Sequence, residues 1–323
     1  MTQLPDRRRT RAVLALLVVT IIWGWTFVWM KQGLDAAQRV VGTSTHASVV
    51  GMMVALRFGT AALLLPVFQP ACLRELDKRG WLGGLLLGGL LVSGFELQIL
   101  GLTGVSAPVS AFLTSLYVIF TAMIGAVVLR RIPAGPMLVG VLLATFGAGF
   151  ISGPPQLSFD LPEWLTVGGA FIFSLHILAT DRVTKVVSPS AVTFATFVVI
   201  ALGGLATFGY GMSRADAPDS ALLRALATDP GYLRPMLLTI VLATVVALSL
   251  MNRFQRDLPP VRAAILYALE PVWATLVAVS MGMETFGTWL LIGGGALIAG
   301  NLIAELGPRR AAAALLPPAP PPG

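Results

Sequence analysis

Hydrophobic residues along this chain come in runs of about 17 to 22 residues, and short polar segments separate the runs. Each run is close to the ~20 helical residues that cross ~30 Å of hydrocarbon. We therefore predict an all-α membrane protein with ten transmembrane helices. The expected spans are residues 12–31, 48–68, 81–101, 107–128, 136–152, 164–181, 191–211, 235–254, 261–282 and 287–306.

One pair of predicted spans occurs twice, in residues 107–151 and 260–306. A shift of 153 positions pairs Leu116 with Leu269, Phe120 with Trp273, Gly140 with Gly293 and Gly147 with Gly300. The polar linker 153–163 separates two halves of five spans each. Because five is odd, the second half is turned over in the membrane. We expect two inverted five-helix repeats, residues 12–152 and 164–306, with a substrate site at their interface.

Composition supports a membrane protein and argues against several other classes. The chain has 323 residues, of which 56% are hydrophobic and 11% charged, whereas soluble domains carry about 25% charged residues. A net charge of +7 would fit nucleic acid in a soluble protein, but here the basic residues collect in loops, so no nucleic-acid partner is expected. A single cysteine and two histidines provide no metal-ligand cluster, so we expect no metal and no cofactor.

Basic residues also predict the orientation. Arginines crowd the N-terminal tail, residues 1–11, and most of the 22 Lys and Arg residues fall in loops on that same side. The positive-inside rule then places both termini in the cytoplasm, with the chain in a bacterial inner membrane. The first apolar run reaches Met30 without a signal-peptidase site, so it reads as a retained span. Residues 307–323, rich in Ala and Pro, are expected to form a disordered tail, and a short helix is expected near Ala221–Ala227.

Six short motifs follow one another along the chain. They are Trp23-Gly24-Trp25-Thr26-Phe27, Leu56-Arg57-Phe58, residues 100–107, Leu269-Glu270-Pro271-Val272, Gly282-Met283-Glu284 and the glycines from Gly293 to Gly300. In these motifs the chain resembles the drug/metabolite transporter superfamily, specifically the EamA-type transporters, over residues 12–306. The resemblance implies secondary transport of small metabolites, often amino acids or related compounds, frequently as efflux. Two positions depart from the family pattern: Arg130-Arg131 replace its Gly-Glu after the fourth span, and Val118 replaces its proline.

Ionisable residues inside the spans mark the candidate site, because a charge at the bilayer centre costs ~2.5–3.5 kcal/mol. Glu270 lies near the middle of the ninth span, on nearly the same helix face as Tyr267. It is either a cavity carboxylate that binds a cation or a proton, or a carboxyl group that bonds backbone freed by Pro271. His176, near the middle of the sixth span, is either a proton relay or substrate ligand, or an interior histidine satisfied by a neighbouring helix.

The repeat and the helical period add further candidates. Thr26 aligns with His176 at a shift of 150 positions, and Tyr117 aligns with Glu270 at the shift of 153. Ser110 and Thr114 precede Tyr117 at helical spacing. The substrate-cavity candidates are Trp25, Thr26, Ser110, Thr114, Tyr117, His176, Tyr267 and Glu270. The candidates for proton coupling or an ion pair are Glu96, Arg57, Glu270 and His176. Glu96 and Arg57 lie in the outer halves of adjacent antiparallel spans, where a Glu96–Arg57 ion pair is sterically reasonable.

Glycines in three spans predict close helix contacts. They are Gly83, Gly84, Gly88 and Gly89 in the third span, and Gly140, Gly147, Gly149, Gly293, Gly294, Gly295 and Gly300 in the fifth and tenth. Small residues let helix backbones approach. We expect the third span to pack inside the bundle, and the fifth and tenth to pack within the chain or to face a second copy in a homodimer.

The function predicted from these features is a secondary transporter that works by alternating access, with export as the expected direction and with the lipid bilayer and a small-molecule substrate as partners. No ATP-binding motif is present, so transport is gradient-driven or passive. One alternative is a membrane-embedded enzyme acting on a lipid or isoprenoid carrier, but the cluster of acids and histidines that such chemistry needs is missing, so we expect no enzyme. Another is a non-transporting sensor or scaffold.

Overall fold

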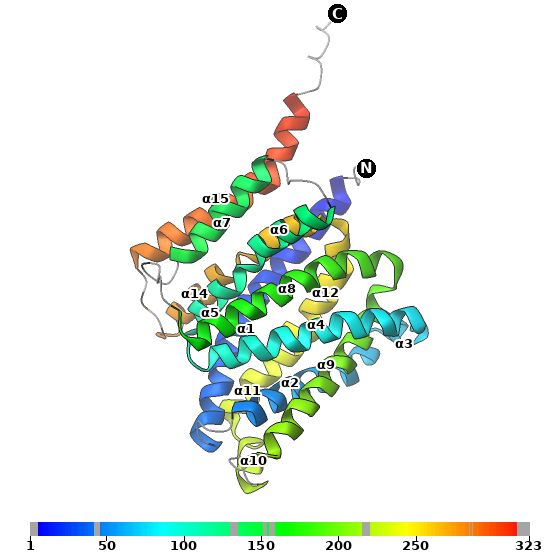
Figure 1. Cartoon of the computed structure of the whole chain (residues 1–323), viewed down its shortest axis with the longest axis vertical. Coiled ribbons are helices and arrows are strands. Elements are labelled where there is room, and N and C mark those ends of the chain that lie inside the picture. Colours follow the sequence, from blue (N-terminus) through cyan, green and yellow to red (C-terminus); the bar gives the residue numbers. More distant parts are fainter. Residues whose placement is uncertain are drawn as a thin grey trace, which may run out of the picture.

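The computed structural model describes residues 6–41, 46–129, 135–150, 154, 159–214, 220–283, 285 and 287–314. All secondary structure in these residues is helical (Figure 1). The first half contains α1 (Asp6–Val41), α2 (His46–Phe68), α3 (Ala71–Arg74), α4 (Lys78–Leu102), α5 (Ala107–Ser115), α6 (Tyr117–Leu129) and α7 (Gly135–Phe150). The second half contains α8 (Leu161–Val186), α9 (Pro189–Met212), α10 (Ser220–Leu226), α11 (Pro230–Leu238), η1 (Thr239–Val246), α12 (Ala247–Phe254), η2 (Gln255–Asp257), α13 (Pro260–Tyr267), α14 (Glu270–Ser280) and α15 (Thr288–Ala314).

Eight helical segments of the described residues are long and apolar enough to cross a membrane. They are residues 7–41, 47–68, 78–102, 107–128, 161–186, 189–212, 230–257 and 260–280. Two shorter apolar helices, Gly135–Gly147 and Leu291–Gly300, occupy the fifth position of each half. The chain is therefore an integral, multi-pass helical membrane protein, and ten spans remains the number predicted from the sequence.

Several element ends differ from the expected ones. α1 runs well past the predicted span at both ends, and α10 matches the short helix expected near Ala221–Ala227. α15 continues to Ala314, beyond the expected start of the tail at residue 307, because its last turns are rich in alanine, the strongest helix former. Arg130, Arg131, Glu284, residues 315–323, and residues 153 and 155–158 of the linker lie outside the described residues.

The fifth helices of the two halves, α7 and α15, lie side by side (Figure 1). A Cβ atom on Gly147 would overlap the carbonyl of Gly293, and one on Gly300 would lie 2.8 Å from the carbonyl oxygen of Gly140. A shift of 153 positions turns Gly140 and Gly147 into Gly293 and Gly300, so each of the two contacts is the repeat equivalent of the other. Because Gly147 lies against Gly293 and Gly140 against Gly300, the two helices run antiparallel. An exchanged pair of contacts is the mark of a two-fold relation, here about an axis perpendicular to both helices. These glycines thus pack the two halves together within one chain.

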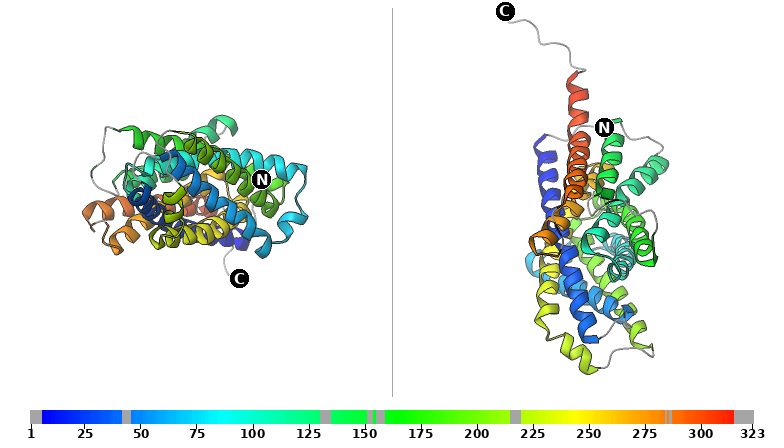
Figure 2. Two further views of the ribbon diagram at one scale, coloured as in Figure 1. Left: turned by 90° about the horizontal axis from the view of Figure 1, so that it is seen from below. Right: turned by 90° about the vertical axis from the view of Figure 1, so that its left-hand side faces the viewer.

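The second helices of the two halves show the same relation on the opposite side of the bundle, where α2 and α9 pack together (Figures 1 and 2). A Cβ atom on Gly51 would lie 2.7 Å from the Cα of Phe208, and one on Gly204 would lie 2.6 Å from the nitrogen of Ala55. The 153-residue shift exchanges these contacts as well. A pseudo-two-fold axis therefore relates α2 to α9 and α7 to α15.

The glycines of the third span, in α4, hold that helix against α8 and α9. A Cβ atom on Gly83 would lie 2.7 Å from Val183, and one on Gly88 would lie 2.6 Å from Val199. A Cβ atom on Gly84 would overlap Ala195, whereas Gly89 faces no atom within 4 Å. Packing against neighbouring helices thus accounts for three of the four glycines.

The fourth and ninth spans are both interrupted, and at equivalent positions. The fourth breaks at Leu116, whose N–H bonds to the carbonyl of Leu113 at 3.3 Å. The ninth breaks at Ala268 and Leu269, and the Leu269 N–H bonds to the carbonyl of Leu266 at 3.2 Å. These i→i−3 bonds form a tight turn in place of the regular helix ladder. New helices then start at residues 117 and 270, related by the 153-residue shift.

Candidate functional site: a cavity between the two halves

A cavity lies between the halves, bounded by α1, α2, α4, α8, α12 and the two breaks. Its apolar wall consists of Trp23, Phe27, Met30, Leu91, Phe95, Phe173, Ile177, Leu248 and Met251. Its polar groups are Thr26, Arg57, Gln98, Tyr117, His176, Tyr267 and Glu270. An apolar cavity with a few converging polar groups is the usual form of a small-molecule site.

Tyr117 and Glu270 bond to each other across the two halves. The Tyr117 hydroxyl donates to Glu270 Oε1 at 3.3 Å, and the two residues are only 3% and 4% exposed. They are also repeat counterparts. Two equivalent positions can touch only where the pseudo-two-fold axis passes between them. The hydrogen bond of the Glu270 side chain therefore goes to the other half of the molecule, not to backbone freed by Pro271.

The first-span motif Trp23-Gly24-Trp25-Thr26-Phe27 builds the wall beside this pair. A Cβ atom on Gly24 would overlap Trp273 and lie 3.1 Å from the carbonyl oxygen of Glu270, so glycine lets α1 approach α14 here. Thr26 lines the cavity and donates to the carbonyl of Ile22 at 2.9 Å. Trp25 does not line it: Trp25 is 37% exposed, and its ring packs on Trp29 at 5.7 Å.

Tyr267 lines the cavity with its ring, and its hydroxyl forms a hydrogen bond outside the cavity. The ring lies 5.4 Å from that of Trp23, centroid to centroid. The hydroxyl donates to Gln255 Oε1 at 3.0 Å rather than to Glu270. Gln255 is buried in the short η2 turn. This bond ties the cavity wall to the turn that joins α12 and α13.

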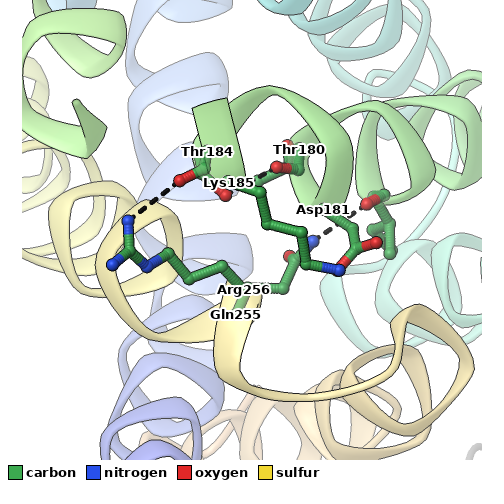
Figure 3. A network of polar contacts seen from close by, with 7 residues as sticks. Thr180, Asp181, Thr184, Lys185, Gln255 and Arg256 are labelled. Carbon is green, nitrogen blue, oxygen red and sulfur yellow. Dashed lines mark hydrogen bonds and ion pairs between the residues drawn. The ribbon is translucent and has the colours of Figure 1, made fainter. Parts of the chain in front are cut away.

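The same turn is held to the end of α8 by the polar contacts of Figure 3. Gln255 Nε2 donates to the carbonyl of Ile177 at 2.9 Å, and Arg256 Nη1 donates to the carbonyl of Thr184 at 2.9 Å. Beside them, Lys185 and Asp181 form an ion pair of 2.7 Å within α8. The network therefore fixes where α13 begins, and with it the position of Tyr267.

His176 also lines the cavity, as does Thr26. The His176 Nε2 atom lies 3.3 Å from Thr180 Oγ1, one turn along the same helix. The imidazole ring of His176 therefore has a hydrogen-bond partner within α8 and also lines the cavity.

The predicted ion pair between Glu96 and Arg57 is wrong. Glu96 Oε1 accepts a hydrogen bond of 2.6 Å from Thr207 of α9, outside the cavity wall. Arg57 donates from Nε to Thr244 Oγ1 at 2.6 Å and lines the cavity. The depths of the two residues in adjacent spans were compatible, but their side chains leave α4 and α2 on different faces.

The partner of Arg57 belongs to a π-helix. η1 replaces α-helix over Thr239–Val246, and within it the Thr244 hydroxyl donates to the carbonyl of Thr239 at 3.0 Å. That bond turns the oxygen of Thr244 toward Arg57. One residue earlier, the carbonyl of Ala243 accepts a hydrogen bond of 3.2 Å from Trp23 Nε1. π-Bulges of this kind often occur at functional sites.

Two further predicted residues, Ser110 and Thr114, do not line the cavity. Ser110 is fully buried, and its hydroxyl has no hydrogen-bond partner among the described residues. Thr114 accepts a hydrogen bond of 3.0 Å from Gln98 Nε2, and Gln98 itself faces the cavity. The structure thus brings Thr26, Tyr117, His176, Tyr267, Glu270 and Arg57 together at the cavity, and leaves Trp25, Ser110, Thr114 and Glu96 outside it.

Sequence reasoning did not place Gln98, Thr244 or Gln255 in the candidate site. Gln98 was detectable, because a glutamine inside an apolar span needs a partner. Thr244 carried no such signal, because a threonine in a helix can satisfy its hydroxyl on its own backbone. Gln255 lies at the end of a span, where a polar residue needs no explanation.

Two pseudo-symmetric helical halves around a central cavity define the architecture of a membrane transporter. The comparisons with known proteins agree: residues 10–153 and 161–305 each match the model of the EamA-like transporter family. The chain therefore belongs to that family. An uncharacterized transporter of Archaeoglobus fulgidus is 26% identical over 295 residues, covering 88% of this chain and 84% of that protein. A crystal structure of another protein, 15% identical, shares the fold with a TM-score of 0.68 over 94% of this chain and 99% of that chain.

Proposed function

We propose that this membrane transporter is a secondary exporter of small metabolites, such as amino acids or related compounds, and that it works by alternating access. The observation that carries the proposal is the Tyr117–Glu270 pair, which lies where the two halves meet and on the wall of the cavity. In transporters built from inverted repeats, the substrate site lies at this interface and discontinuous helices form it. The two breaks beside Tyr117 and Glu270 have that arrangement.

Glu270 is the proposed proton-coupling group. It is buried, faces the cavity, and has a neutral hydroxyl as its hydrogen-bond partner, with no ion pair among the described residues. A carboxyl group in such a place can change its protonation state when the cavity opens to water on one side. His176 faces the same cavity, whereas Glu96 lies at the α4–α9 contact. We therefore propose that Glu270 couples transport, with His176 as the second candidate.

We also propose an orientation of the protein in the membrane and a homodimeric assembly. The basic loops favour cytoplasmic termini in a bacterial inner membrane, with ten spans in two inverted halves. α15 carries Gly294 and Gly295, which face no atom of the described chain within 4 Å. A homodimer through this face of α15 is the assembly we propose.

The test is a metabolite screen in proteoliposomes, with and without a pH gradient. We expect at least one small metabolite to cross, faster with an imposed proton gradient. A variant with Glu270→Gln, His176→Gln and Glu96→Gln should transport no faster with the gradient than without it. Unchanged gradient-driven flux in this variant would rule out proton coupling through these groups. Binding of a metabolite without any flux would favour a sensor or scaffold instead.

A further inference from the structure

Arg57 is a buried cation for which the described residues provide no counter-ion. The residue is 2% exposed and forms no ion pair in that part of the chain. An arginine keeps its charge at any physiological pH, and a buried charge without an opposite partner is strongly unfavourable. Glu270, the acidic residue of the same cavity wall, bonds to Tyr117 and forms no ion pair with Arg57, so a ligand that enters the cavity is the candidate source of the negative charge.

Most of the guanidinium's donor groups are unused. Arginine has five N–H donors. Its hydrogen bonds with the described residues use Nε, which donates to Thr244, and Nη1, which lies 3.6 Å from the weakly accepting sulfur of Met30. Nη2 makes no hydrogen bond with the described residues, and Arg57 lines the cavity. A planar fork with free N–H groups matches the two oxygens of a carboxylate.

The guanidinium is held in place before any ligand arrives. Its central carbon lies 5.0 Å from the ring centroid of Phe58 and 4.7 Å from that of Phe95. Thr244, oriented by the π-helix, fixes Nε. Two aromatic faces and one short hydrogen bond restrict the group without neutralising it. A preorganised donor loses little freedom on binding, which favours affinity.

Beyond Arg57, most of the cavity wall is apolar or aromatic. The geometry points to Arg57 as a carboxylate-binding residue, and we infer that the ligands are small organic monoacids with an apolar or aromatic body. The inference deepens the proposed transport function and rests on it for its biological meaning. Carboxylate binding itself can be measured without transport.

An α-amino group adds little to this mode of binding. The guanidinium of Arg57 recognises the carboxylate, which acids with and without an amino group share, whereas Glu270 already bonds to the Tyr117 hydroxyl. Acids with and without the amino group should bind alike.

The test is calorimetric titration of the purified full-length protein with matched pairs of probes. The acids are 4-methylpentanoate, 3-phenylpropanoate and phenylalanine, and the controls are the two amides 3-phenylpropanamide and phenylalaninamide. We expect at least one acid to bind, with its amide about tenfold weaker or more. Absence of binding by every acid, or equal binding of an acid and its amide, would overturn the inference.

Two variants of the site and one matched control locate the binding residue. Arg57→Gln should remove the difference between acid and amide, and Arg57→Lys should restore only part of it, because an ammonium has no planar fork. Thr244→Val keeps the charge and should weaken acid binding severalfold, which keeps the test open if Arg57→Gln does not fold. Arg224→Gln removes an exposed arginine of α10 that does not line the cavity, and it should change nothing. An intact preference for acids in Arg57→Gln would assign the carboxylate to another group.

The same variants separate the two proposals. Acid binding that depends on Arg57 without any flux in proteoliposomes would contradict transport and leave the carboxylate site standing. Flux of acids and amides alike, unaffected by Arg57→Gln, would leave transport standing and contradict the carboxylate site.

Discussion

The break between α5 and α6 and the break between α13 and α14 lie at equivalent positions but in different sequences. Leu116 is followed by Tyr117 and Val118 in the first half. Leu269 is followed by Glu270 and Pro271 in the second. Both breaks contain a tight i→i−3 turn, and each starts a new helix at the residue that bonds to the other half.

This difference shows that a break at this position does not require a proline. Val118 can donate a backbone hydrogen bond, and the fourth span breaks all the same. Pro271 lies in the first turn of α14, where its missing N–H removes no helix bond. We therefore attribute the break to the packing of the two halves, and we predict that Pro271 is dispensable for it. The hydrogen bond from Tyr117 favours a role of Glu270 in the cavity over a role in holding backbone beside Pro271.

The largest expected effect comes from removing the group that only the second half has. Glu270→Gln keeps the size of the side chain and its ability to accept from Tyr117, but it cannot take up a proton. We expect gradient-driven flux in proteoliposomes to fall by about tenfold or more. Glu96→Gln, which changes a carboxylate outside the cavity wall, is the matched control and should keep most of the flux. Equal losses in the two variants would contradict a special role for Glu270.

Exchanging the two residues tests their equivalence. If Tyr117 and Glu270 face each other across a pseudo-two-fold axis, a chain with both Tyr117→Glu and Glu270→Tyr rebuilds the same hydrogen bond in the opposite sense. We expect its flux to lie above that of Glu270→Tyr alone. A double variant no better than this single variant would show that the surroundings of the two positions are not interchangeable.

A smaller effect is expected from the hydroxyl of Tyr117. Tyr117→Phe removes one long hydrogen bond to Glu270, of 3.3 Å. The cost should be near ~1 kcal/mol, or about fivefold in flux. Tyr210→Phe is the control, because Tyr210 is exposed at the end of α9. A loss as large as that of Glu270→Gln would mean that the phenol itself is essential.

The smallest effect is expected from the proline. Pro271→Val places at this position the residue type that Val118 provides in the first half. Since the fourth span breaks without proline, we expect the fold and the flux to be retained and the stability to change by less than ~1 kcal/mol. Thermal unfolding of the purified protein measures this change. Loss of folding or of flux would make the proline a cause of the break after all.

The arrangement of spans was predictable from sequence because it rests on period and length. The 153-residue shift, read from Leu116 and Leu269, also predicted that Tyr117 and Glu270 are equivalent. Their contact was not predictable, because equivalence does not say how far two positions lie from the axis. The Glu96–Arg57 pair failed because depth in the membrane does not fix the helix face. Thr244 was missed because a π-turn shifts the register by one residue without changing the apolar pattern.

The protein is well suited to a chemical test of access to the cavity, because Cys72 is its single cysteine and is fully buried in α3. Burial raises the pKa of the Cys72 thiol, and backbone hydrogen bonds offset this only in part. A thiol with a raised pKa has less thiolate at neutral pH, so Cys72 should react slowly with maleimides and faster as the pH rises. The native chain is thus its own background control.

The most direct test of alternating access is the labelling of Thr26→Cys in oriented membrane vesicles with a membrane-impermeant maleimide. Thr26 lines the cavity, so a thiol there reports which side of the membrane the cavity opens to. Alternating access predicts that the thiol reacts from both sides, and that a transported substrate slows labelling from each. Labelling from one side only, under every gradient and with every substrate, would contradict it.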